Sequence, residues 1–270
     1  MSIGIILGSS FADGAELAGT LTPEPVHTAH GDVVLHRAPR GVFGPRQVWV
    51  LFRHGLPHRY LPHQIPYRAH ALALQQVGVQ ALLVTSSVGL LDPELPLGQP
   101  MLVRDLLMPD NRLPDGSTCT IFTELSSAQG HLVLDEGLFS VSLAEQLRAC
   151  ARQHAIGLGP EVVFAYVGGP RTKTAAENAF WRAMGAQVNS MTLGPEVVLA
   201  NELEIPAVAL VVGHKPSGAH GQDDVSQSTV RRSLHTARQA LEELVWAFAS
   251  EAEPPGFANH VYRFSRPTAG

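Results

Sequence analysis

Cysteine is scarce in this chain, which has only two such residues, Cys119 and Cys150. Two thiols cannot form a metal cluster by themselves, and these two lack the CxxC spacing of redox and zinc motifs. We expect both to be idle or buried thiols in a cytoplasmic protein without disulfide bonds.

Long apolar runs and blocks of basic residues are also missing. The longest apolar stretches, such as residues 207–212, are far shorter than the ~20 residues that span a bilayer. Met1 leads directly into a strand-like run, without the basic region and cleavage site of a targeting segment. The chain carries a net charge of −5 and no Lys/Arg-rich block, so we expect neither a membrane nor a nucleic acid as its partner.

The composition is that of a globular protein with a large core, because 45% of the residues are hydrophobic and 16% are charged. A length of 270 residues fits a single α/β domain. We therefore expect one domain over residues 1–250 and a tail over residues 251–270, which packs on the body or on a neighbour.

Apolar runs alternate with helical patterns along the chain. The runs show no strict polar alternation, which indicates strands buried on both faces, and their succession with helices predicts an α/β sandwich. The expected strands are residues 3–7, 47–52, 81–85, 161–167, 187–189 and 206–212, and the expected helices are residues 64–77, 174–184, 195–203 and 225–250.

Small, hydroxylic or cationic residues follow four of the predicted strands. Ligands of open α/β sheets bind beyond the carboxyl ends of the strands, so we expect these residues near one site. Hydroxyls, glycine-turn N–H groups and an arginine fork are the groups that hold a phosphate dianion. Four such segments together indicate an oxyanion site, and the alternative is that they only shape loops. The segments are Gly8-Ser9-Ser10, Arg53-His54-Gly55, Ser86-Ser87-Val88-Gly89 and Gly168-Gly169-Pro170-Arg171.

Four of the thirteen histidines lie close together, and imidazole is the commonest metal ligand. Prolines interrupt this segment, so no regular helix can align His54 with His58. We therefore expect no metal at this cluster. The histidines are His54, His58, His63 and His70, and the prolines are Pro57, Pro62 and Pro66.

Several longer motifs occur in a definite order between residues 3 and 250. They are Ile3-Gly4-Ile5-Ile6-Leu7-Gly8-Ser9-Ser10; Arg53-His54-Gly55 with His58, Pro62, Tyr67-Arg68-Ala69 and Ala71-Leu72; Thr85 to Gly89 with Leu97-Gly98 and Asp105; Gly169-Pro170-Arg171 with Ala176-Glu177; and Ser190-Met191-Thr192 with Pro195-Glu196-Val197. In content and order this set resembles the purine nucleoside and 5′-methylthioadenosine phosphorylases, the trimeric nucleoside phosphorylases.

The resemblance implies a single-domain phosphorylase-type sandwich, with a mixed central sheet flanked by helices, assembled as a homotrimer. It implies inorganic phosphate as co-substrate and no metal or organic cofactor. Met191 would pack against the ribose, and His58 matches a histidine that a neighbouring subunit can contribute to the sugar end. The implied phosphate-binding residues are Ser9, Arg53, His54, Ser86, Ser87 and Thr192.

The base-recognition segment departs from the family. Where its members carry a carboxylate or amide for the purine N7 edge, this chain has His214 and Lys215, followed by Pro216 and Ser217. We take His214, Lys215 and Ser217 as the candidates that assist departure of the base, while a solvent-facing Lys215 is the alternative. Thr172 stands where an aromatic residue often stacks on the base, so base stacking is expected to be weaker. The remaining departures are Pro66 and His70 for two asparagines and Ser10 for a glycine.

The predicted activity is therefore phosphorolysis of the N-glycosidic bond of a purine-type nucleoside, with or without a 5′ modification such as that of 5′-methylthioadenosine, and with altered base recognition. Breaking the ribosyl C–N bond builds positive charge on the sugar and negative charge on the base, so positioning and electrostatics carry the reaction. Two alternatives stay open: a nucleoside hydrolase on the same fold, and a non-catalytic protein that binds nucleoside or phosphate.

Overall fold

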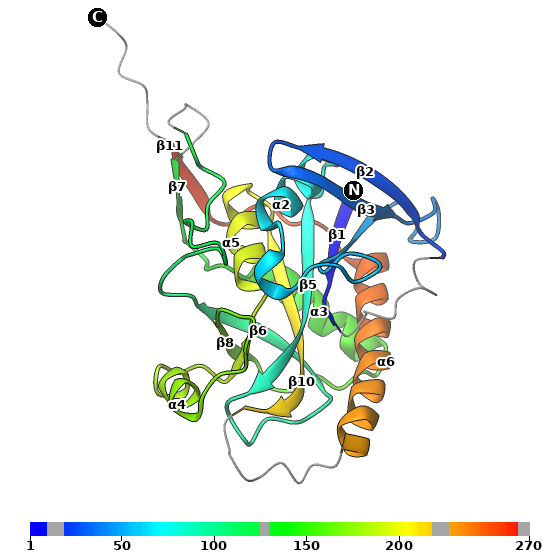
Figure 1. Ribbon diagram of the computed structural model, residues 1–270. Helices are drawn as coiled ribbons and strands as arrows, with labels where there is room; N and C mark the ends of the chain where they lie inside the picture. Colours follow the sequence, from blue (N-terminus) through cyan, green and yellow to red (C-terminus); the bar gives the residue numbers. More distant parts are fainter. Residues whose placement is uncertain (10–18, 125–129, 218–226, 264–270) are drawn as a thin grey trace, which may run out of the picture.

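The computed structural model describes residues 1–9, 19–124, 130–217 and 227–263, with side chains from residue 238 onward in the last helix. Within these ranges, nine strands form one mixed sheet in the order β10-β6-β8-β9-β5-β1-β4-β3-β2 (Figure 1). Strand β10 also pairs with β5, so β5, β10, β6, β8 and β9 close into a ring that β1, β4, β3 and β2 extend as an open sheet. The strands are β1 (Ser2–Leu7), β2 (Thr22–Thr28), β3 (Gly31–Arg37), β4 (Gln47–Phe52), β5 (Ala81–Leu90), β6 (Pro100–Leu107), β8 (Val162–Tyr166), β9 (Val188–Ser190) and β10 (Ala207–Pro216).

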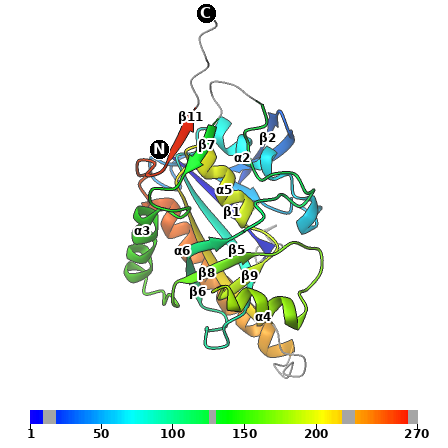
Figure 2. The same cartoon turned by 90° about the vertical axis from the view of Figure 1, so that its left-hand side faces the viewer.

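Helices cover both faces of this sheet. Helices α3 (Val141–Gln153) and α6 (Gln227–Glu251) pack together on one face, and α2 (Tyr67–Gln76) and α5 (Gly194–Glu202) pack on the other (Figure 2). Helix α4 (Ala175–Ala183) follows β8 and begins at a capping box between Thr174 and Glu177, which satisfies N–H groups of its first turn.

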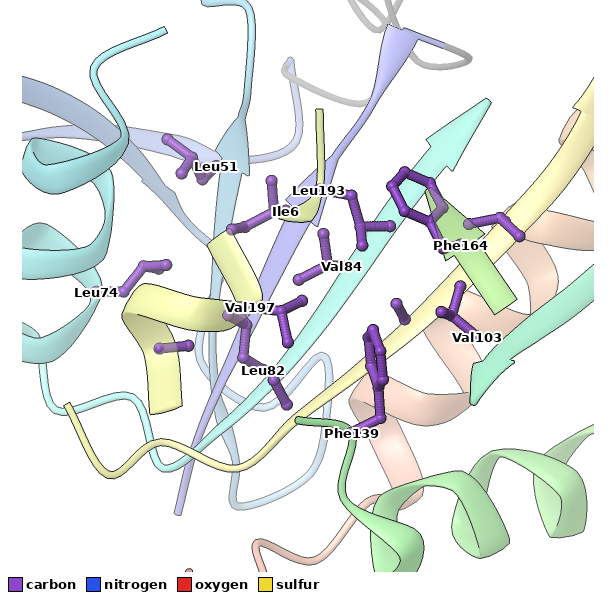
Figure 3. Close-up of a cluster of buried hydrophobic side chains, with 14 of the residues drawn as sticks. Ile6, Leu51, Leu74, Leu82, Val84, Val103, Phe139, Phe164, Leu193 and Val197 are labelled. Atoms are coloured by element: carbon purple, nitrogen blue, oxygen red, sulfur yellow. The ribbon is translucent and has the colours of Figure 1, made fainter. Parts of the chain in front are cut away.

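The alternation of side chains along β1 explains the two cores. Ile3 and Ile5 belong to the cluster under α3 and α6, whereas Ile6 points to the opposite face and packs with Leu82 and Val84 of β5 and Val197 of α5 (Figure 3). Because β1 is buried on both faces, its sequence is continuously apolar. The predicted α/β sandwich is confirmed.

Two strands continue further than their sequences suggest. Strand β5 runs through the segment from Ser86 to Gly89, and β10 runs through His214 and Lys215 to Pro216. The expected ends of these strands, at residues 85 and 212, were too early, because parallel pairing between β5 and β10 supplies backbone partners that the local sequence does not reveal. Polar side chains therefore project from strands, which hold them more rigidly than loops would.

The sequence interpretation missed α3, β6 and the antiparallel β2–β3 hairpin. Residues 251–263 run back along the body, where β11 (His260–Arg263) pairs with β7 (Gly130–Val133). No helix among the described residues is both long enough and apolar enough to cross a membrane.

Candidate active site

A cavity of about 870 Å³ opens where β1, β5, β9 and β10 end, within the size range of small-molecule sites. The loop after β8, the segment after β4 and helix α6 complete its wall. Eleven of the twelve site residues predicted from the sequence line it: Ser9, His54, His58, Ser86, Ser87, Thr172, Met191, Thr192, His214, Lys215 and Ser217. Arg53 is the exception.

A cluster of hydroxyl groups forms one end of the cavity. The Ser86 Oγ lies 3.3 Å from the Thr192 Oγ1 and donates a hydrogen bond to the Ser190 Oγ at 3.4 Å. Leu193, directly after Thr192, has a φ of +76°, an uncommon conformation for a branched residue that marks a constrained turn. Because this turn and β5 hold the hydroxyls in place, the cluster is preorganised to donate to an oxyanion.

Arg53 lies behind this end of the cavity. Its Nε and Nη2 donate to the two carboxylate oxygens of Glu196 at 2.7 and 2.6 Å, and both side chains are 1% exposed. Its Nη1 approaches Gly8, because a Cβ atom at Gly8 would lie 2.8 Å from that nitrogen. The guanidinium thus supports the turn that carries Ser9, and a direct contact between Arg53 and phosphate stays a prediction.

The rings of His54 and His58 stack with their centroids 4.5 Å apart. The His54 Nδ1 lies 2.8 Å from the Tyr60 carbonyl oxygen, which places its proton on that nitrogen and leaves Nε2 as an acceptor. Burial lowers the pKa of His54 to about 4, opposed by the Tyr60 carbonyl and assisted by the charges of Arg53 and His58. His54 is therefore neutral at pH 7. His58 lines the cavity of its own chain. The resemblance instead implies that this histidine contributes to the site of a neighbouring subunit.

The other end of the cavity carries the residues that depart from the family. A β-bulge interrupts β10 between Gly213 and Lys215, and bulges next to sites redirect side chains. His214 sits in this bulge. Burial lowers its pKa and Lys215 lowers it further, while the backbone of Val88 opposes both effects. Its buried Nδ1 has no hydrogen-bond partner among the described residues. The Lys215 side chain is exposed on the rim.

The sequence interpretation missed five polar residues of the wall: Lys173, Asn178, Asn189, Ser190 and Arg238. Asn189 accepts a hydrogen bond from the Ser217 Oγ at 3.3 Å and donates one to the Asn178 Oδ1 at 3.1 Å. Strand β9 has only three residues, Val188–Ser190, so it is too short for an alternating pattern that could have revealed Asn189.

Lys173 belongs to the loop between β8 and α4. Its Nζ donates to the carbonyl oxygens of Gly168 and Arg171, and burial lowers its pKa, with a further contribution from the Arg171 charge. Arg171 is itself paired with Glu177 of the capping box. These contacts tie the loop to the start of α4 and hold the ammonium in the wall.

Comparison with known proteins identifies the family of this chain. A family model described as the phosphorylase superfamily matches residues 2–250. The 6-oxopurine nucleoside phosphorylase of Pyrococcus furiosus is 31% identical over 229 residues, which cover 83% of this chain and 83% of that protein. The probable S-methyl-5′-thioinosine phosphorylase of Pseudomonas syringae pv. tomato is 28% identical over 239 residues, or 87% of this chain and 93% of that protein.

The structure of methylthioadenosine phosphorylase from Schistosoma mansoni, solved with adenine, superposes with a TM-score of 0.80 at 23% identity and covers 93% of this chain and 91% of that one. It therefore shares the fold. With the family match over nearly the whole chain, the prediction of a phosphorylase-type pentosyltransferase is confirmed: this chain belongs to the phosphorylase superfamily.

Proposed function

We propose that the chain transfers the ribosyl group of a purine-type nucleoside to inorganic phosphate, releasing the free base and ribose 1-phosphate. The observation that carries this proposal is the hydroxyl cluster of Ser86, Ser190 and Thr192 at one end of a cavity that has room for a nucleoside beside it. The relatives named as nucleoside phosphorylases support the same reaction.

The residues suit the two charges that develop in this reaction. Phosphate held by the hydroxyl cluster lies below the sugar, where it stabilises the positive charge that grows at C1′ and then attacks that carbon. The base leaves with the electron pair of the C–N bond, and Lys215 and His214 at the opposite end donate to it. Preorganised donors at the places where charge develops are the main source of catalysis in such sites.

The proposal includes altered recognition of the base, because a histidine and a lysine, His214 and Lys215, occupy the positions at which the phosphorylases that this chain resembles carry a carboxylate or amide. The same proposal includes a nucleoside with or without a 5′ modification as the substrate. It also includes assembly of the chain as a homotrimer. Light scattering of the purified protein measures the assembly directly.

A nucleoside panel with and without phosphate tests the reaction, with free base and sugar phosphate followed by chromatography. We expect release that depends on phosphate, and Ser86→Ala should raise the KM for phosphate about tenfold or more, because a hydrogen bond to a charged group contributes roughly 1.5–3 kcal/mol. Ser142→Ala on α3, outside the cavity, is the matched control.

Other outcomes would contradict the proposal. Release that proceeds equally without phosphate would identify a hydrolase. Binding of nucleoside or phosphate without turnover across the whole panel would identify a non-catalytic homologue.

A further inference from the structure

The ionisable side chains around the cavity are all bases. Within the described part of the chain, every ionisable residue that lines it is basic, although the whole chain carries a net charge of −5. The chain has only two lysines, and both are in this wall. The basic residues are His54, His58, Lys173, His214, Lys215 and Arg238.

The register of the sheet places Lys215 away from the hydroxyl cluster. Ser86 and Ser87 of β5 pair with Val211 and Val212 of β10, whereas Lys215 pairs with Gly89. Two residues along a strand correspond to ~7 Å. Lys215 therefore lies at the rim end of the cavity, ~7 Å further along the sheet than Ser87, and the base would sit there.

Gly89 leaves room for a polar relay at that end. A Cβ atom at Gly89 would lie 2.0 Å from the Ser217 Oγ, so only glycine admits this hydroxyl. The Ser217 Oγ donates to the Asn189 Oδ1, and the Asn189 Nδ2 donates to the Asn178 Oδ1. Both amide oxygens are thus occupied as acceptors.

The relay ends in an unused donor. Asn178 is 6% exposed and lines the cavity, and its Nδ2 has no hydrogen-bond partner among the described residues. Lys215 also presents only donors, since an ammonium group has no acceptor. The base end therefore offers N–H groups and positive charge.

A purine edge pairs with these N–H donors when it presents only acceptors. Adenine presents the N7 acceptor beside the N6 amino donor, whereas a 6-oxopurine presents the N7 and O6 acceptors together. A second carbonyl adds another acceptor and makes the ring N–H more acidic, so the base and its leaving form carry negative charge more readily. A donor that meets another donor in a site of this kind leaves both unpaired.

The geometry points to a 2,6-dioxopurine, the base type of xanthosine, as the preferred leaving group, with Asn178, Asn189 and Lys215 as its specificity-determining residues. This inference rests on the proposed phosphorolysis. Asn189 acts through Asn178 by fixing which atom of the terminal amide faces the cavity.

The test compares kcat/KM for xanthosine, inosine and adenosine at saturating phosphate, together with calorimetric binding of free xanthine and free adenine. We expect xanthosine to exceed adenosine by at least about tenfold, the discrimination that one matched hydrogen-bonding edge supplies. Adenosine or inosine as the best substrate would overturn the inference and leave the proposed function standing. Absence of phosphate-dependent cleavage from any nucleoside would instead overturn the proposed function.

Two variants locate the preference. Lys215→Met, on the exposed rim, should lower the xanthosine-to-adenosine ratio about tenfold, while Arg182→Met on the exposed side of α4 removes the same charge outside the cavity and should leave the ratio unchanged. Asn189→Asp should shift the ratio in the same direction, because the new carboxylate would accept from the Asn178 Nδ2 and turn the Asn178 Oδ1, an acceptor for the amino group of adenine, toward the cavity. An unchanged ratio in Lys215→Met would overturn the assignment, and that variant decides the question if Asn189→Asp fails to fold.

Discussion

Replacing Arg53 with methionine leaves the carboxylate of Glu196 buried without its partner. The two side chains are each 1% exposed, and both nitrogen–oxygen contacts are 2.7 Å or shorter. Breaking one half of such a buried pair destabilises a protein by roughly 3–5 kcal/mol, whereas replacing both halves by apolar residues is often nearly neutral. We therefore expect Arg53→Met to be strongly destabilised and the double variant Arg53→Met/Glu196→Met to recover most of the loss.

Urea unfolding followed by circular dichroism measures these free energies, and equal m-values across the variants validate the comparison. A loss of less than ~1 kcal/mol in Arg53→Met, or a double variant no more stable than the single one, would refute the reasoning.

The stable double variant also separates the two roles of Arg53. Its Nη1 is the terminal nitrogen that Glu196 does not use, and a raised KM for phosphate is expected if this nitrogen contributes to phosphate binding. An unchanged KM would show that Arg53 only supports the turn at Gly8 and Ser9.

Two further predictions concern residues near this pair. Gly8→Ala should destabilise the protein by ~1–3 kcal/mol and raise the KM for phosphate, because the added Cβ would lie 2.9 Å from the Thr85 carbonyl oxygen. Thermal unfolding measures the loss of stability, and phosphate saturation measures the KM. A fully stable variant would contradict the prediction. His70 is buried, and burial together with Arg53, Arg59 and His54 lowers its pKa to about 3 from 6.5. The unfolded chain takes up this proton at a higher pH than the folded chain does, so the contribution of neutral His70 to the free energy of unfolding is present above pH 6.5 and is lost as the pH falls toward 3. Between pH 8 and pH 5, the free energy of unfolding of His70→Asn in urea titrations should therefore fall by ~2 kcal/mol less than that of the parent. Equal losses of unfolding free energy in the variant and the parent would contradict this assignment to His70.

Local sequence pattern predicted much of the fold, because burial on both faces makes the central strands continuously apolar. Strands β1 and β4 and helices α4 and α5 lie within two residues of the expected bounds. The β2–β3 hairpin was missed because three prolines or glycines and several exposed polar residues weaken its pattern: Pro23, Pro25 and Gly31 all lie within it.

The candidate site was predictable to the extent that its residues stand in short motifs. Ser9, Ser86 and Thr192 each belong to one, and all three line the cavity. Asn178 and Asn189 were not predictable in this way, because their importance depends on Ser217, which is 28 residues from Asn189 in the chain and meets it only across β5.

The sequence by itself determined the succession of strands and helices, the family and the hydroxyl groups of the phosphate end, since each depends on nearest neighbours or on a local motif. Only the tertiary structure decided the partner of Arg53, which lies 143 residues away, and the donor character of the base end. A hydrogen bond between distant segments is set by strand register and close packing, and neither leaves a local mark in the sequence.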